Sequence, residues 1–466
     1  MKNQLLQRRE PPAGAMELNY KPPLHGWRWQ AALFLVACLA FGFRYYYVVH
    51  AQVLQPVDQP NVRADAVDYY HYARNLVDHG VFSISEPGAT KPVGDSYRDP
   101  GYPLFLAAWL RISSAWPVWY AGVLISQAVL GAFTVLLLVL VGRSWLPAAW
   151  SLAAGGILAV WPHCVAMNSY LLTETLVGFL CAAGLVQLNR AVARSSTIGL
   201  FVSGLFFSTA ALTNAVIYPF VFLASLWMRG RKLLNGKMML CLMSGSLVLL
   251  IPWMLRNSQL PAGSLSSTGR AIDNLVQGSW PSYHAAYQAA MRNDPNGEII
   301  MLAIDHETTE MHANVVSGMG LLWRRISHHP LEYAAWYTSK PFLLWGWDIG
   351  MGQGDVYVYP TRNSPFVTND LYRAVIAVCH ALNGALFWCA AGGCFLVLLS
   401  ASSALPDPTA TALLLVYVTV VYSVLAVDPR YSTPFRGEEI LMATTALRAA
   451  WIGIGRSYFR RSARAT

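Results

Sequence analysis

The sequence predicts an all-α membrane protein with about ten transmembrane helices and two periplasmic loop regions that carry amphipathic interfacial helices. Only 12% of the 466 residues are charged, about half the ~25% found in an ordinary globular chain. Hydrophobic residues make up 55% of the chain. They also gather in runs of roughly 20 residues, the length that a helix needs to cross the hydrocarbon core of a bilayer. Only helices satisfy their own backbone hydrogen bonds in such runs, so we expect each run to be helical.

Ten apolar runs have about this length, and each is interpreted as one span. They lie near residues 29–48, 118–142, 147–164, 170–188, 197–213, 215–228, 238–255, 371–398, 409–427 and 438–455. The uncharged stretch 197–228 is too long for one upright crossing, so we expect two short spans that meet at Thr213–Asn214. Residues 331–347 are also apolar, but their Trp and Tyr content favours a helix that lies at the outer interface.

The distribution of charge predicts the orientation. If the N-terminus is cytoplasmic, the inside segments hold 16 basic residues and only three acidic ones, whereas 17 of the 24 acids fall in 58–99 and 273–370. The positive-inside rule therefore places both termini in the cytoplasm and the loops 50–116 and 257–370 on the outer side of the membrane. The net charge of +9 then reflects topology, and no nucleic-acid partner is expected.

The chain divides accordingly into three parts. These are a cytoplasmic tail, residues 1–28, a transmembrane domain, residues 29–456, and a basic cytoplasmic tail, residues 457–466.

The first periplasmic loop begins with a short amphipathic helix. In residues 65–80, apolar side chains recur at helical spacing, and Gly80 is a typical helix stop. Asp65 stands where an N-cap residue is expected, with Asp68 three residues later. Two interpretations of Asp65 stay open at this point: a plain helix cap, or a general base in a cleft at the membrane surface.

The same loop places an arginine near the interface. Residues 96–107 read SYRDPGYPLFLA, in which Pro-Gly-x-Pro favours a turn followed by a helix. The turn holds Arg98 at a defined position close to the membrane. An arginine at that position can bind lipid headgroups, or it can clamp a phosphate with two hydrogen bonds.

The two patterns D-A-x-x-Y-x-x-x-A-x-x-L and R-x-P-G-Y-P-L-F-L-A together resemble bacterial integral-membrane glycosyltransferases of the GT-C fold. This family uses polyprenyl-phosphate-linked sugars and includes aminoarabinose transferases that act on lipid A and protein O-mannosyltransferases. The matching residues are Asp65, Tyr69, Ala73, Leu76, Arg98, Pro100, Gly101, Tyr102 and Pro103. The resemblance implies that Asp65 is the catalytic first-loop acid, with Asp68 as the second candidate.

Three later elements extend the resemblance in the expected order. Leu172–Leu176 is similar to a T/S-E-x-L element that carries Glu174, and Pro252–Asn257 is similar to P-W-x-x-R-N, which carries Arg256. Asp428–Pro434 is similar to an R-Y-x-x-P element, which carries Arg430 and Tyr431. Two positions depart from the family pattern: Asp99 replaces a common proline, and Asn214 replaces a common arginine.

The resemblance implies sugar transfer from a polyprenyl-phosphate donor to an envelope acceptor, lipid or glycan, at the outer face of the membrane. Asp65 or Asp68 would take the proton of the acceptor hydroxyl. The donor phosphate would lie among Arg98, Arg256 and Arg430, so that these three arginines and Asp65 surround one cavity. Tyr69, Tyr102, Glu174 and Tyr431 would position the substrates. A divalent metal is possible at the acidic pair, and the sequence leaves it open.

Three other classes remain as alternatives. A secondary transporter should carry ionisable residues within its spans, whereas here the polar residues concentrate in the outer loops. A lipid-linked oligosaccharide polymerase or ligase should carry a late loop rich in Arg and His. A non-catalytic membrane protein would need none of the motifs, and the missing basic residue at Asn214 keeps this alternative open.

Overall fold

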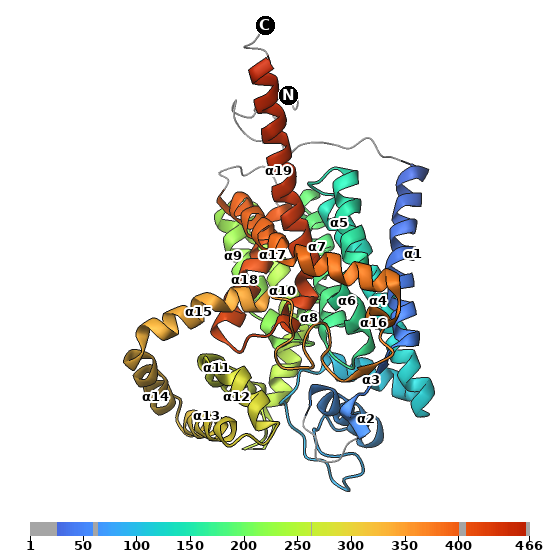
Figure 1. Cartoon of the computed structure of the whole chain (residues 1–466). Coiled ribbons are helices and arrows are strands. Elements are labelled where there is room, and N and C mark those ends of the chain that lie inside the picture. The colour runs from blue at the N-terminus through green and yellow to red at the C-terminus, as the bar shows by residue number, and fades with distance from the viewer. Residues whose placement is uncertain (1–25, 59–63, 262, 400–406, 463–466) are drawn as a thin grey trace.

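The computed structural model describes residues 26–58, 64–261, 263–399 and 407–462, with side chains up to residue 453. The predicted cytoplasmic tail before residue 26 lies outside these residues. Nearly all regular structure is helical, and most helices form one bundle (Figure 1). The bundle helices are α1 (Trp27–His50), α4 (Trp116–Gly142), α5 (Ala148–Val160), α6 (Pro162–Ala166), α7 (Glu174–Ala193), α8 (Thr197–Ala211), α9 (Phe220–Gly230), α10 (Gly236–Ser258), α17 (Asp370–Leu399), α18 (Asp407–Val424) and α19 (Arg436–Ser462).

Every predicted span coincides with one or more of these helices, and the chain is an all-α polytopic membrane protein. Within the described residues, five helices are long and apolar enough to cross a bilayer: α1, α4, α7, α10 and α17. A sixth span arises if the bent pair α5 and α6 counts as one crossing. The helices α8, α9 and α18 are apolar but shorter, so the count of ten stays a prediction.

Two features of the predicted spans differ in detail from the sequence interpretation. The run 147–164 is not one straight helix, because the chain bends by 59° between α5 and the short helices α6 and η2 (Met167–Ser169). Pro162 at the start of α6 removes a backbone donor at this bend. At the other end of the chain, α19 continues to Ser462, into the segment that the sequence assigned to a tail. The break predicted at Thr213–Asn214 is confirmed, since α8 ends at Ala211 and Asn214 caps the short helix η3 (Ala215–Ile217).

The end of the bundle opposite residue 27 carries the remaining elements, and we call it the outer end (Figure 1). The first loop contributes η1 (Pro56–Asp58), α2 (Asp65–His79) and α3 (Gly101–Ile112). A two-residue strand β1 (Gln52–Val53) pairs antiparallel with β2 (Thr361–Arg362), just before α16 (Pro365–Thr368). This pairing joins the first loop to the second.

The second loop folds into a lobe of its own, which we call the arm (residues 267–344). It consists of α11 (Ser267–Ser279), α12 (Tyr283–Ala290), α13 (Pro295–Ala313), α14 (Val315–His328) and α15 (Pro330–Leu344), and it extends sideways from the bundle (Figure 1). A small core of its own holds the arm together, built on Val276, Tyr283, Ile304, Met311 and Leu322. The arm is anchored where Gly278 meets the backbone at Leu425, an approach too close for any side chain.

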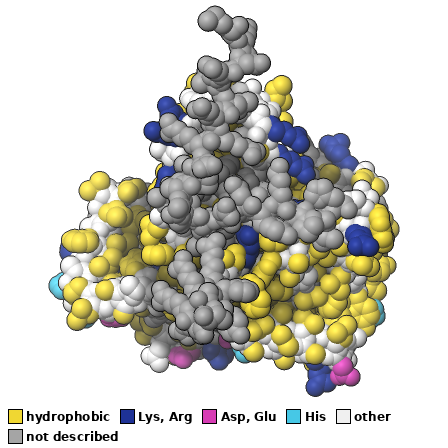
Figure 2. All heavy atoms as spheres, turned by 90° about the horizontal axis from the view of Figure 1, so that it is seen from above, with side chains coloured by type: hydrophobic (Ala, Val, Ile, Leu, Met, Phe, Trp, Pro, Cys, Tyr) yellow, Lys and Arg dark blue, Asp and Glu magenta, His cyan; other side chains and the backbone are white. Residues whose placement is uncertain are grey.

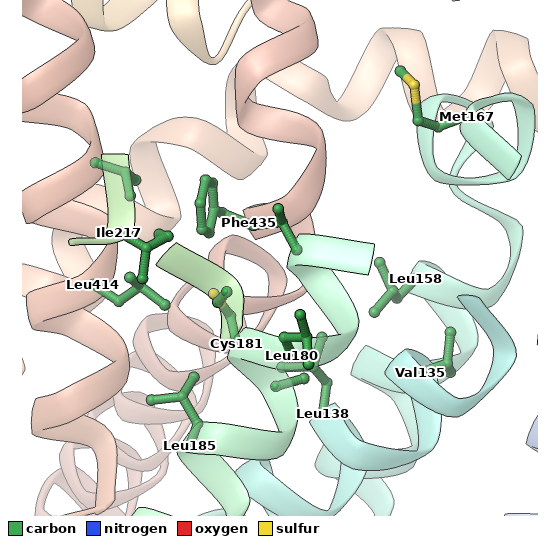
Figure 3. Close-up of a cluster of buried hydrophobic side chains, with 14 of the residues drawn as sticks. Val135, Leu138, Leu158, Met167, Leu180, Cys181, Leu185, Ile217, Leu414 and Phe435 are labelled. Carbon is green, nitrogen blue, oxygen red and sulfur yellow. The ribbon is translucent and has the colours of Figure 1, made fainter. Parts of the chain in front are cut away.

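The main hydrophobic core lies between α4, α5, α7, α18 and the 3-10 helix η4 (Pro429–Phe435). Figure 3 shows its centre, with Leu138 and Leu180 close together, and Leu158 and Phe435 belong to the same cluster. Phe435 is 1% exposed, so the packing of its side chain in the core fixes the position of η4. That segment includes Arg430, and the core therefore positions one of the predicted site residues.

Candidate active site

Asp65 lies in the first turn of α2, at the outer end of the bundle. The helix forms where the sequence predicts it, and Gly80 ends it in the left-handed conformation with φ of 68°. The prediction that Asp65 is the N-cap is wrong: Ala64 occupies that position and no side chain caps the helix. The carboxylate of Asp65 points instead to two arginines from distant segments.

Arg98 is the first of these arginines and bridges both acids of the first loop. Its Nη2 atom lies 2.6 Å from Asp65 Oδ1 and 2.6 Å from Asp68 Oδ2, and its Nε atom lies 2.9 Å from Asp68 Oδ2. The guanidinium also lies against the rings of Tyr69 and Tyr97, 5.4 and 5.2 Å from their centroids. Arg98 therefore occupies a defined position, as the turn sequence predicted.

Arg430 is the second arginine and reaches the same carboxylate from η4. Asp428 caps this short helix by accepting from Arg430 N at 2.9 Å, and Pro429 follows it directly. Arg430 Nη2 then lies 2.5 Å from Asp65 Oδ2. Its Nε atom lies 3.1 Å from Oε1 of Glu174, the first residue of α7. Three segments far apart in the sequence thus meet at one point.

The four tyrosine and glutamate residues expected to position substrates lie in or directly beside this cluster. Glu174 is in it, through Arg430. Tyr69 packs edge-on against Tyr102, with ring centroids 5.2 Å apart. Tyr431 stacks on Tyr422 and lies beside the Arg430 guanidinium. The aromatic rings form apolar walls around the charged groups.

Arg256 is placed differently from the prediction. Its guanidinium donates to the backbone carbonyls of Asp95 at 2.5 Å and Phe82 at 3.1 Å, and it lies over the rings of Phe82 and Trp253. These contacts hold the connection between α2 and α3. Of the three arginines that we expected to surround one cavity with Asp65, Arg98 and Arg430 contact Asp65 directly, whereas Arg256 contacts the neighbouring loop.

The two departures from the family pattern are connected in space. Asp99 Oδ2 accepts from Ala215 N at 3.1 Å, directly after Asn214, and from Arg270 Nη2 of the arm at 2.7 Å. Arg270 also lies over the ring of Tyr97, the neighbour of Arg98. The sequence analysis missed Arg270, because it stands in a region without a motif. No sequence signal distinguishes it, since the loop 257–370 contains six Lys and Arg residues.

The electrostatics of the cluster separate its two aspartates. Burial disfavours the charged form of Asp65, but Arg98 and Arg430 outweigh this effect and hold the pKa of Asp65 well below its ordinary value. Burial also acts on Asp68 and outweighs the opposing effects of Arg98 and His71, and Asp65 adds repulsion, so the pKa of Asp68 is raised. Asp65 is therefore the firmly ionised member of the pair at neutral pH.

A metal site was left open by the sequence. Within the described residues, no group of three or more His, Cys, Asp and Glu side chains is placed to hold a metal ion. The carboxylates of Asp65, Asp68 and Glu174 contact guanidinium groups. The groups that neutralise negative charge here are thus arginines.

Comparison with known proteins shows the class of the fold. No protein-family model matches the sequence, and no curated protein matches it. Among solved structures, the apo form of the oligosaccharyltransferase from Archaeoglobus fulgidus superposes with a TM-score of 0.50 at 13% identity, over 93% of this chain. This likeness shows the fold alone: the chain shares the GT-C fold of that structure, the fold that its motifs resemble.

The chain spans about half the length of that oligosaccharyltransferase, 52%. A second structure, apo ArnT from Cupriavidus metallidurans, matches with a TM-score of 0.37 at 13% identity, over 90% of this chain and 77% of that one.

Proposed function

We propose that this protein transfers a sugar from a polyprenyl-phosphate donor to an extracytoplasmic envelope acceptor, a lipid or a glycan. The observation that carries the proposal is the position of the Asp65 carboxylate between Arg98 and Arg430 at the outer end of the bundle. A reaction of this type needs one base and at least one cation, and both are present within hydrogen-bonding distance of each other. The GT-C fold supports the same class of reaction.

The proposed chemistry uses Asp65 as base. The acceptor hydroxyl gives its proton to Asp65, and its oxygen attacks the anomeric carbon of the donor sugar. The bond between that carbon and the phosphate oxygen breaks, and the polyprenyl phosphate leaves with its added negative charge. Arg98 and Arg430 stabilise this charge as it develops.

The resting ion pairs give the donor a second role. A carboxylate held by two guanidinium groups is a weak base, because its pKa is depressed. The donor phosphate is itself an anion and competes for Arg98 and Arg430. As these arginines turn to the phosphate, the basicity of Asp65 rises. Donor binding would thus prepare the base for the acceptor.

The orientation follows from the same proposal. Residue 27 and the C-terminal part of α19 lie at the end of the bundle opposite α2 and the arm (Figure 1). This arrangement supports a bacterial inner-membrane protein with cytoplasmic termini and a periplasmic site, in which the lipid-linked donor and the bilayer are the partners.

The test is a transfer assay with a matched control. Purified protein is incubated with labelled polyprenyl-phosphate sugars and extracted envelope, and Asp65→Asn is compared with Asp78→Asn. Asp78 lies on the same helix α2 and pairs with Arg74 at the surface. We expect Asp65→Asn to lower the rate by about 10²- to 10⁴-fold, the usual contribution of a general base, and Asp78→Asn to act as wild type. Equal label incorporation by all three proteins would exclude the proposed role of Asp65.

A further inference from the structure

A cavity in the bundle is lined by Glu174, whereas Asp65 is not among its lining residues. Its volume is about 40 Å³, which is room for more than one water molecule. Its walls come from α1, α4, α5, α6, η2, α7, η4 and α19, and they carry both apolar and polar residues. The polar lining residues include Arg44, Asn168, Glu174 and Thr433.

Each of these four side chains has a buried polar atom without a hydrogen-bond partner in the part of the chain that the structure describes. The atoms are Arg44 Nε, Asn168 Oδ1, Glu174 Oε2 and Thr433 Oγ1. All four residues are at least nine-tenths buried, between 0% and 6% exposed. Arg44 Nε is a donor, Asn168 Oδ1 and Glu174 Oε2 are acceptors, and the Thr433 hydroxyl can be either. Bound water molecules can form hydrogen bonds with all of them.

Gly131 on α4 shows where two of these atoms meet. A Cβ atom at this position would lie 2.5 Å from Asn168 Oδ1 and 2.7 Å from Arg44 Nε. Asn168 Oδ1 and Arg44 Nε therefore both pack closely against this glycine, which also lines the cavity. A water molecule in the adjoining cavity space would give the donor and the acceptor the partner that each lacks.

Arg44 is otherwise hard to explain. It is 1% exposed on the first transmembrane helix, and its terminal nitrogens donate to the backbone carbonyls of Ala40, Ala159 and Leu158. Among the described residues, no carboxylate lies within ion-pair distance of it. Backbone carbonyls are common partners of a charged group buried in a membrane protein, but they leave the positive charge of Arg44 without a counter-ion.

The ion-pair cluster of the candidate site has the opposite imbalance. Asp65, Asp68 and Glu174 contribute three carboxyl groups, whereas Arg98 and Arg430 contribute two guanidinium groups. Glu174 faces both regions, because Oε1 contacts Arg430 and the residue also lines the cavity with Arg44. Arg44, which lines the same cavity as Glu174, is a cation outside this cluster.

We propose that Arg44 is a positioning residue that acts through water in this cavity, keeps Glu174 ionised and thereby holds Arg430 against Asp65. The proposal rests on the proposed function in one respect: the purpose of the held Arg430 is to stabilise the leaving phosphate. The charge coupling itself is independent of that purpose, so the two are tested separately.

The first test is infrared spectroscopy of the purified protein at neutral pH. Arg44→Met should add the C=O stretching band of a protonated carboxyl group to the difference spectrum against wild type. The band should vanish in the double variant Arg44→Met/Glu174→Gln and should be missing in Arg44→Lys, which keeps the charge. Arg448→Met is the matched control, because Arg448 is also a buried arginine of a bundle helix that donates to a backbone carbonyl, here that of Trp145. A spectrum of Arg44→Met without the band, or a band that persists in the double variant, overturns the proposal.

The second test uses the wild-type protein and does not depend on the folding of any variant. Hydroxyl radicals generated from bound water oxidise side chains that touch that water. Met167 lines the cavity and is 1% exposed, whereas Met442 is 0% exposed and lies elsewhere in the core. We expect Met167 to be oxidised several-fold faster than Met442. Equal, slow oxidation of both would show a dry cavity and overturn the proposal.

The transfer assay then separates this inference from the proposed function. Displacement of a catalytic group from its working position costs up to about 10²-fold in rate, so Arg44→Met should lose roughly ten- to a hundredfold and Arg44→Lys should recover most of it. If wild type shows no transfer at all, the proposed function fails while the infrared result still decides the coupling. If wild type is active and Arg44→Met transfers at the wild-type rate, the positioning role of Arg44 is wrong.

Discussion

Asp65 and Arg430 are separated by 365 positions in the chain, and their side chains meet at 2.5 Å. Asp65 comes from the first loop after α1, and Arg430 comes from the turn before the last helix. The candidate site is thus assembled from the two ends of the membrane domain, with Arg98 and Glu174 between them. This arrangement leads to four predictions beyond the tests above.

Replacement of Arg98 or Arg430 by lysine should abolish most of the activity. Each arginine contacts two carboxylates with its Nη2 and Nε atoms, a planar fork of donors that the single ammonium group of lysine cannot reproduce. We expect the transfer rate to fall by about 10²- to 10³-fold, as when one donor to a developing oxyanion is removed. Arg74→Lys on the outside of α2 should act as wild type, since Arg74 pairs only with Asp78 at the surface. Single-turnover rates at saturating donor measure the effect on the chemical step.

Arg256→Ala should behave in another way. Arg256 holds the carbonyls of Phe82 and Asp95, so its loss should loosen the connection between α2 and α3. We expect about 1–3 kcal/mol of lost stability and faster proteolysis within residues 81–97, with less than a tenfold loss of rate. Thermal unfolding and limited proteolysis measure these effects. If Arg256→Ala instead loses as much rate as Arg98→Lys and keeps its stability, Arg256 binds the donor phosphate, as the sequence analysis predicted.

The ion pairs of Asp65 predict a pH dependence of stability. The folded protein holds the pKa of Asp65 well below that of the unfolded chain, so the carboxylate binds fewer protons when folded. The stability that the Asp65 carboxylate contributes is therefore complete above the pKa of Asp in the unfolded chain, about 3.9, and it is lost as the pH falls below that value. Compared with wild type, Asp65→Asn should be less stable by a constant amount between about pH 6 and 8, and the difference should shrink below about pH 4. Denaturation in the same detergent at each pH tests this, and a difference that grows towards low pH would contradict it.

The arm should contact the membrane through α14 and α15. Trp323 and Leu331 are 68% and 85% exposed, and Arg324, His328 and His329 lie beside them with no acid in α14. Figure 2 looks at the molecule from the end where α19 finishes. On this face of the arm, at the left of the view, many of the side chains are hydrophobic. An apolar stripe flanked by basic groups is typical of a helix that lies in the interface, where we expected residues 331–347.

Cysteine labelling in bilayers tests this contact. Trp323→Cys and Leu331→Cys should react slowly with a membrane-impermeant maleimide. Asp305→Cys, on the exposed acidic side of α13, should react quickly. Equal rates at all three positions would place the arm away from the lipid.

The sequence predicts some parts of this structure well and others not at all. Apolar runs of sufficient length identify all the bundle helices, because burial in lipid leaves helices as the only solution. The convergence of Asp65, Arg98, Glu174 and Arg430 was predicted only through motifs, since no local pattern reports a contact over hundreds of residues. Arg256 follows the same kind of motif but donates to backbone carbonyls, a choice that depends on the exact path of residues 81–97.

Arg44 and Arg270 illustrate what a single sequence does not reveal. Arg44 reads as an arginine near the end of a span, where a side chain normally extends to the headgroups. Only the packing of α1 against α5 turns it inward to the carbonyls of Leu158 and Ala159. Arg270 is placed beside the candidate site by its contact with Asp99, which lies 171 positions earlier in the chain.

The junction of Asp65 with Arg430 also has a consequence for how the protein is made. During synthesis, Asp65 and Glu174 leave the ribosome long before Arg430 does, so a nascent or truncated chain carries acidic groups at the membrane that lack their final counter-ion. Insertion of the last hairpin, α18 to α19, completes the charge balance. A chain cut before residue 430 should therefore be an easy target for membrane proteases, whereas the finished chain is not.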